Sequence, residues 1–192
     1  KFQPILDGVK SSRFYQTLGL AQRSSEEQFS DSWDRFFNRM KILHESEADI
    51  TEECSRMCNI MMTRDEKMRE MVKRNFTPED YFAVRDHMIG TGMIGGKACG
   101  MLLARSIIRN REPDIADYLE PHDSFYVGSD LYYTYIVDNG LWDLRIKQRT
   151  EEGYFTLAEE FAKKIMEGEF APAMREQFIR IIKYYGQDPY II

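Results

Sequence analysis

Five glycines fall between positions 90 and 100 of this chain, and this dense stretch limits the local fold more than any other feature. Glycine destabilises helices and adopts backbone conformations that other residues avoid, so the stretch predicts a turn that ends one helix and opens another. Residues 97–110 form the second helix, in which the unpaired N–H groups and the positive dipole end face the turn. We therefore expect an anion-binding site formed by Gly95, Gly96 and Lys97.

The spacing of Gly90, Gly92 and Gly95 matches the Gly-x-Gly-x-x-Gly fingerprint of dinucleotide-binding folds. That fingerprint requires a strand immediately before its first glycine, whereas residues 78–88 have the pattern of a helix. It also requires an acidic residue at the end of a second strand, and the polar region that follows the second helix carries Pro113 instead. An oxidoreductase of this fold, which would bind NAD in preference to ATP, is therefore only a minor alternative.

The phosphate-binding loop of P-loop nucleotide hydrolases fits less well. A match ending at Gly96-Lys97 would need glycine at position 91 and serine or threonine at position 98, where the chain has Thr91 and Ala98. What remains is a Gly-Gly-Lys triplet at the start of a helix. Taken alone, such a triplet is also compatible with a tight turn and a solvated lysine.

The triplet belongs to a longer pattern. Three further segments follow the triplet along the chain, and their order and spacing are part of the pattern. They are Ala98-Cys99-Gly100-Met101-Leu102-Leu103-Ala104, Pro121-His122-Asp123-Ser124-Phe125-Tyr126-Val127-Gly128-Ser129-Asp130 and Tyr184-Tyr185-Gly186-Gln187-Asp188-Pro189-Tyr190-Ile191-Ile192. Together they resemble the N-terminal nucleotide-binding domain of phosphoenolpyruvate synthase and pyruvate phosphate dikinase, which has an ATP-grasp fold. The resemblance covers about residues 85–192 and does not extend to the earlier part of the chain.

The resemblance implies that Gly95, Gly96 and Lys97 bind the phosphates of ATP, which the family uses together with magnesium. Such enzymes transfer phosphate to a histidine on a separate domain and from there to an acceptor such as pyruvate. The family's phosphate-binding arginine, magnesium-binding acids, second lobe and histidine domain would follow the strand that begins at Tyr190. We therefore expect no catalytic residue and no metal ligand within this chain, and we expect it to be inactive alone.

Hydrophobic periodicity predicts helices along most of the chain. The expected helices cover residues 26–44, 50–61, 66–75, 78–88, 97–110, 130–137, 156–167 and 173–184, with short strands at 125–127 and at the C-terminal end. Thr77, followed by Pro78, is expected to cap the helix over 78–88, and Ser129 or Asp130 the helix that ends at Val137. The fold class is therefore α+β and helix-dominated. The domain division combines a helical N-terminal extension, residues 1–76, with the first portion of an ATP-grasp-like domain, residues 77–192.

Composition excludes some classes of partner and indicates a compartment. A net charge of −6 and a pI near 5.2 argue against nucleic acid and anionic membranes as general partners. The chain has no apolar run long enough to span a bilayer, and its three cysteines suggest a reducing, cytoplasmic setting.

Cysteines and histidines outside the glycine stretch have ordinary interpretations. Cys54 and Cys58 share a helical face, and a zinc site would need two more ligands, of which only His44 is near, so core packing is the better interpretation. We expect Cys99 to pack as well. His122, at a strand entrance, and His87, late in a helix, are expected to be structural.

A second hypothesis places the chain in another class, a non-catalytic interaction or sensing domain with a decayed nucleotide site. The helical extension would then carry the partner site, and its methionine-rich face between residues 26 and 75 suits a protein partner, although methionine stripes are more often part of a core. Such a surface could also form a homodimer.

Overall fold

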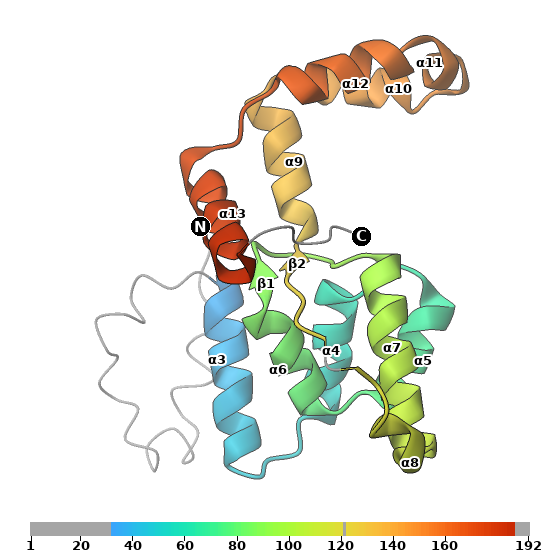
Figure 1. The fold of residues 1–192 in the computed structure, drawn as a ribbon, viewed down its shortest axis with the longest axis vertical. Coiled ribbons are helices and arrows are strands. Elements are labelled where there is room, and N and C mark those ends of the chain that lie inside the picture. Colours follow the sequence, from blue (N-terminus) through green and yellow to red (C-terminus); the bar gives the residue numbers. More distant parts are fainter. Residues whose placement is uncertain (1–31, 121, 187–192) are drawn as a thin grey trace, which may run out of the picture.

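The computed structural model describes residues 32–120 and 122–186, and within them the protein is helix-dominated with one small sheet (Figure 1). Its elements in chain order are α3 (Ser32–Glu45), α4 (Thr51–Met61), α5 (Glu66–Asn75), α6 (Pro78–Asp86), β1 (Met88–Ile89), α7 (Gly96–Arg111), α8 (Pro113–Ala116), β2 (Tyr126–Val127), α9 (Ser129–Asp138), α10 (Trp142–Gln148), α11 (Glu151–Thr156), α12 (Ala158–Glu167) and α13 (Pro172–Tyr185).

Helices α3 to α7 and the two strands form the body of the molecule around one hydrophobic core. The apolar residues of α3 and α4 lie three and four positions apart and therefore share one face of each helix. Full burial of each such side chain contributes roughly 1.5–3 kcal/mol. The core includes Phe37, Met40, Met57, Cys58, Met61, Met62, Val72, Tyr81, Val84, Cys99, Leu103 and Tyr126. It draws on both sides of residue 76, and the domain boundary there stays a prediction.

The methionines of this part of the chain contribute to the interior. Met57, Met61 and Met62 are fully buried and Met40 nearly so, while Met71 remains exposed. The expectation that a methionine-rich face between residues 26 and 75 forms a partner surface is therefore wrong for these four side chains. Their flexible thioethers fill the space between α3, α4 and α6 instead.

Capping residues explain why α5 and α6 begin where the sequence predicts. The Asp65 side chain accepts a hydrogen bond from the Met68 amide at the start of α5. At the start of α6, the Asp80 carboxylate accepts a hydrogen bond from the Thr77 amide, and Pro78 occupies the first helical position. Both helix starts agree with the expected boundaries.

The end of α6 differs from the expectation. The helix ends at Asp86 rather than at residue 88, because Met88 and Ile89 leave it to form β1. This strand pairs in parallel with β2, with Met88 opposite Tyr126 and Ile89 opposite Val127. Strand, glycine turn, helix α7 and parallel strand thus form a β-α-β unit.

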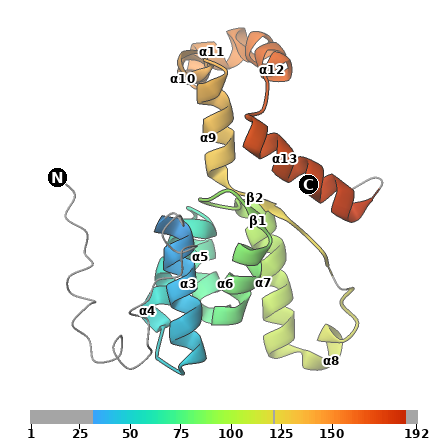
Figure 2. The ribbon, with the colours of Figure 1, turned by 90° about the vertical axis from the view of Figure 1, so that its left-hand side faces the viewer.

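Beyond β2, helices α9 to α13 extend from the body (Figure 2). Helices α10 to α12 form a group at the far end of α9, where Ile136, Leu141 and Phe161 make a small separate core. Helix α13 returns toward the body, and its Met174 packs with Ile89 and Leu131.

The short helices α8, α10 and α11 were not expected from the sequence, whereas α12 and α13 lie close to the predicted ranges. Residues 26–31 of the first predicted helix and the strand expected to begin at Tyr190 lie outside the described residues. Within the described part of the chain, no helix combines the length and the apolar character that crossing a membrane requires.

Candidate anion-binding site at the start of helix α7

The loop between β1 and α7 is held on two sides by hydrogen bonds to its backbone. On one side, the Thr91 amide donates to Asp130 Oδ1 at 2.8 Å and the Met93 amide donates to Ser129 Oγ at 3.1 Å. On the other side, the Ile94 amide donates to the Met61 carbonyl at the end of α4, at 2.9 Å. The loop therefore has a fixed course between the first turn of α9 and the last turn of α4.

Ser129 and Asp130 have a different role from the expected one. The sequence indicates that one of them caps the start of α9, but the N-cap position is Gly128, which makes no side-chain cap. The two side chains instead accept hydrogen bonds from the glycine loop, 36 to 39 residues earlier in the chain. This long-range contact places the loop relative to β2.

The first two glycines of the stretch are required by close packing against α9. Gly90 and Gly92 have φ values of +71° and +82°, which favour glycine. A Cβ atom at Gly90 would lie 1.8 Å from Leu131 Cδ1, and one at Gly92 would lie 2.5 Å from Ser129 Oγ. These two positions face α9, so their backbone is not open to a ligand.

The glycine loop follows a short strand, as the dinucleotide fingerprint requires. The expectation that no strand precedes Gly90 is wrong, because β1 ends at Ile89. In a dinucleotide-binding fold, however, the first glycine makes a tight turn and the second lets the backbone approach the pyrophosphate. Here Gly90 and Gly92 pack against α9 and α7 begins only at Gly96, so the NAD hypothesis remains weak.

The last glycines of the stretch have open surroundings. Gly95 has a φ of +88°, and a Cβ atom at Gly95 or Gly96 would meet no other atom within 4 Å. Both residues and Lys97 are exposed. Lys97 makes no ion pair with any residue that the structure describes. The three predicted site residues therefore lie together at the start of α7 and face open space.

The start of α7 also offers backbone donors. The first bond of the helix joins the Cys99 amide to the Gly95 carbonyl. The preceding amides of Gly96, Lys97 and Ala98 have no acceptor among the described residues. Unlike α5, α6 and α11, this 16-residue helix has neither a side-chain cap nor an acidic residue in its first turn. Three donors, the positive dipole end and one ammonium group can together hold phosphate oxygens.

The thiols lie mostly in the core, as expected. Cys58 and Cys99 are fully buried, and Cys54 is partly buried. Burial raises the pKa of Cys54 and of Cys99 to about 11, so both stay protonated at neutral pH and are poor nucleophiles.

The described residues contain no group of three or more His, Cys, Asp or Glu side chains arranged for a metal ion. His44 lies 2.6 Å from Glu79 through its Nε2 atom.

The other two histidines lie beside the β1–β2 pair. His87 follows the last residue of α6, and its Nδ1 atom lies 3.0 Å from the Ala83 carbonyl, as a histidine at a helix C-terminus is expected to do. Its ring packs on Phe125. His122, four residues before β2, keeps an exposed side chain, but the atoms packed around part of its ring desolvate it, and this effect, followed by the charge of Arg105, lowers the pKa of the imidazole.

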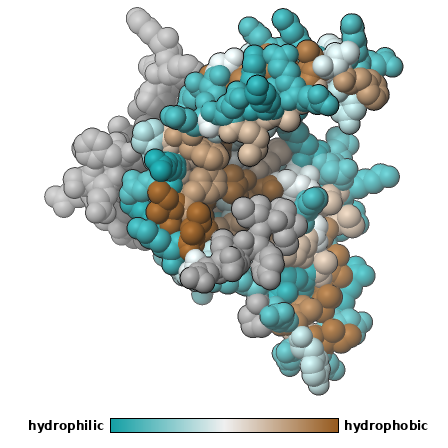
Figure 3. Space-filling view, turned by 45° about the horizontal axis from the view of Figure 1, so that its top comes forward, coloured by the Kyte–Doolittle hydropathy of each residue, from teal (hydrophilic) through white to brown (hydrophobic). Residues whose placement is uncertain are grey.

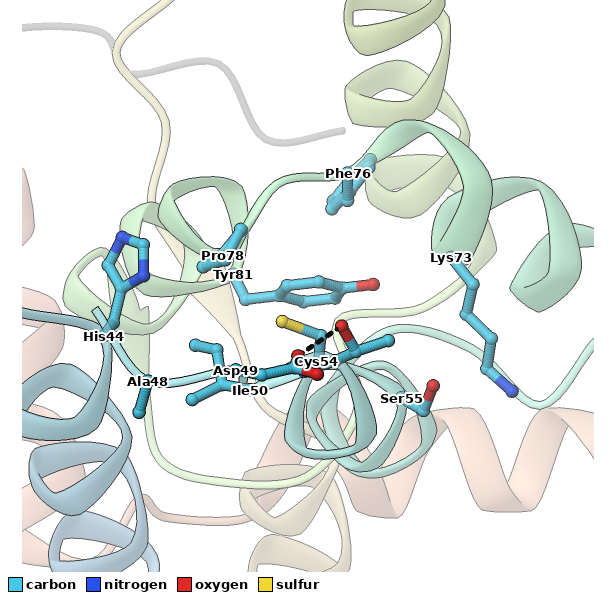
Figure 4. Close-up of a pocket in the computed structure, with 11 residues that line it drawn as sticks. His44, Ala48, Asp49, Ile50, Cys54, Ser55, Lys73, Phe76, Pro78 and Tyr81 are labelled. Atoms are coloured by element: carbon cyan, nitrogen blue, oxygen red, sulfur yellow. Dashed lines mark hydrogen bonds between the residues drawn. The ribbon is translucent and has the colours of Figure 1, made fainter. Parts of the chain in front are cut away.

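Two pockets lie elsewhere in the described structure. The first, of about 340 Å³, lies between the α3–α4 connection, α4 and the start of α6, where the Tyr81 ring and Cys54 line it (Figure 4). The Thr51 hydroxyl donates a hydrogen bond to Asp49 Oδ1, at the edge of the pocket, over 2.7 Å. Lys73 also lines the pocket. The second, of about 280 Å³, lies between α6, α7 and the segment before β2. Sequence reasoning found neither pocket, because both depend on contacts between distant segments.

In comparisons with known proteins, no family model, curated protein or solved structure matches this chain. Any functional assignment therefore depends on the residues and their geometry.

Proposed function

We propose that this chain is part of the ATP-binding domain of a dikinase-like phosphotransferase that resembles phosphoenolpyruvate synthase, with an ATP-grasp-like fold. The observation that carries the proposal is the open, uncapped start of α7, where Gly95, Gly96 and Lys97 come together. Gly90 and Gly92 are explained by packing, but Gly96 has neither a packing contact nor a positive φ to account for it. Close approach of a ligand to the backbone would account for it.

In this function the chain binds and orients the triphosphate. The amides of Gly96, Lys97 and Ala98 donate to phosphate oxygens, and the Lys97 ammonium neutralises part of their charge. Phosphoryl transfer depends mostly on positioning and charge neutralisation, so such a clamp contributes without forming a covalent bond. Magnesium, when bound with ATP, would supply further neutralisation, and its ligands are expected outside this chain.

Two measurements on this chain test the proposal. In an NMR titration with MgATP, we expect the amide signals of Gly96, Lys97 and Ala98 to shift most, because these groups have no acceptor in the described structure. We also expect no steady release of phosphate, because the proposed site binds and orients the triphosphate and contains no group that accepts the phosphate. Steady turnover that disappears in Lys97→Ala would show that the chain is a complete enzyme and would contradict this part of the proposal.

A second candidate function, a protein-interaction domain, is favoured by the hydrophobic surface of α9 to α13. The side chains of Phe155 and Met166 are 80% and 83% exposed, and Val137 and Ile182 are more than half exposed. Figure 3 shows hydrophobic side chains below the mostly hydrophilic band of α10 to α12. The four residues lie on α9, α11, α12 and α13, and a contiguous apolar patch formed by such side chains would be an interaction site. This surface lies on other helices than the methionine-rich segment.

The oligomeric state tests this second candidate. If α9 to α13 mediate self-association, sedimentation velocity should show a fraction of dimer that increases with protein concentration. Phe155→Ser should lower that fraction. Phe155 is the choice because its side chain makes little contact with the rest of the fold, so its loss should not change stability. A monomer at every concentration would exclude the homodimer.

A further inference from the structure

The pocket between α6 and α7 has a composition that the proposed nucleotide site does not explain. Arg105 and Ser106 lie three and four residues after Leu102, and Arg109 lies four and three residues after them, so these side chains share one face of α7. That face lines the pocket opposite residues of α6, and His122, Ser124 and Tyr126 of the segment that leads into β2 line it as well. The site is distinct from the start of α7, because Arg105 lies eight residues beyond Lys97, about 12 Å along the helix.

Positive and ionisable nitrogen groups dominate the polar lining of this pocket. Arg105, Arg109, His87 and His122 all line it, whereas Asp80 is its one carboxylate. Asp80 is already neutralised, because Arg109 Nη2 donates to both of its oxygens at 2.8 and 2.7 Å. In a chain with a net charge of −6, this is a local excess of positive charge.

The donors in the pocket are only partly used by the protein. Arg105 donates through one Nη2 atom to the Glu120 carbonyl at 2.9 Å, which leaves other N–H groups of the guanidinium for a ligand. The His87 Nδ1–H donates to the Ala83 carbonyl, so the Nε2 atom is a second donor for a ligand only in the doubly protonated ring. The lowered pKa of His122, due first to burial and then to the positive charges of Arg105 and His87, agrees with this crowding of positive groups.

We propose that this pocket binds a small phosphate monoester. The phosphate lies beside Arg105 and the two imidazoles, since a guanidinium fork matches the geometry of phosphate oxygens. The organic part of the ligand lies against the apolar lining, which includes Leu102, Phe76 and Tyr126. A volume of about 280 Å³ suits a molecule of the size of phenyl phosphate.

The chain contains three histidines, which makes a direct test possible. His87 and His122 line this pocket, while His44 lines the other one and serves as an internal control. In an NMR titration with phenyl phosphate at fixed pH, we expect saturable shifts of the His87 and His122 imidazole signals and no shift of His44. Phenol, which lacks the charge, should leave all three signals in place. Equal shifts of all three histidines, or equal shifts with phenol, would overturn the proposal.

Variants locate the binding more closely. Arg105→Gln removes the charge but keeps a donor for the Glu120 carbonyl, and it should raise the dissociation constant about tenfold. Arg111→Gln removes an exposed charge of the same helix outside the pocket and should have no effect, as should Lys97→Ala. Binding lost in Lys97→Ala but kept in Arg105→Gln would assign the anion to the start of α7 instead. The titration of the unchanged protein decides the matter even if Arg105→Gln fails to fold.

Discussion

Replacing Lys97 by alanine in the complete natural protein should raise the dissociation constant of MgATP at least about tenfold, since a charge-assisted hydrogen bond contributes roughly 1.5–3 kcal/mol. Lys97 is exposed at the first turn of α7, beside amide groups that have no acceptor among the described residues. Its loss removes charge from the ligand site and breaks no ion pair within the described structure. Calorimetry should therefore show weaker binding with an unchanged melting temperature.

Two further variants separate charge from shape. Lys67→Ala removes an exposed lysine on α5 and controls for the loss of one positive charge from the protein surface. Gly96→Val adds a side chain at a position with 4 Å of open space and without a positive φ, so folding should tolerate it while the phosphate approach is blocked. If Lys97→Ala binds MgATP as tightly as the unchanged protein, Lys97 is not part of the site.

Local features of the sequence predicted the helices well. The range of α5 was predicted as observed from the helical spacing of Met68, Met71 and Val72, and the start of α6 from the capping pattern at Thr77 and Pro78. Burial of Cys58 and Cys99 followed from their positions on apolar helix faces. Helices α10 and α11 were missed, since seven and six residues give too little periodicity to be recognised.

Long-range contacts were the part that sequence reasoning could not supply. Strand β1 has two residues, and only its pairing with β2 distinguishes it from the end of a helix. Likewise, four glycines that look alike in the sequence have different surroundings: Gly90 and Gly92 meet α9, while Gly95 and Gly96 face open space. The triplet of the candidate site was found by its position before a helix. Only the structure shows that the glycines of this triplet, Gly95 and Gly96, differ from Gly90 and Gly92, which pack against α9.

Replacing Gly128 by alanine should destabilise the fold by about 3 kcal/mol, the upper part of the usual range for overpacking. The backbone of Gly128 has a φ of −66°, which any residue adopts, so the expected effect is purely steric. An added Cβ would lie 2.0 Å from the Thr91 carbonyl oxygen and 2.8 Å from the Thr91 amide nitrogen. Both contacts are with backbone, which cannot rotate away as a side chain would.

To admit the methyl group, the glycine loop must separate from the start of α9. That movement strains the bond from the Gly128 amide to the Ile89 carbonyl and the bond from the Thr91 amide to Asp130. Urea unfolding measures the loss, and Gly100→Ala is the matched control. A Cβ at Gly100 meets nothing within 4 Å, and alanine in the interior of α7 should stabilise the protein by roughly 0.5–1 kcal/mol. If Gly128→Ala unfolds at the same urea concentration as the unchanged protein, the glycine loop does not lie against β2 as described. The loop would then lack the support that holds Gly95, Gly96 and Lys97 at the start of α7.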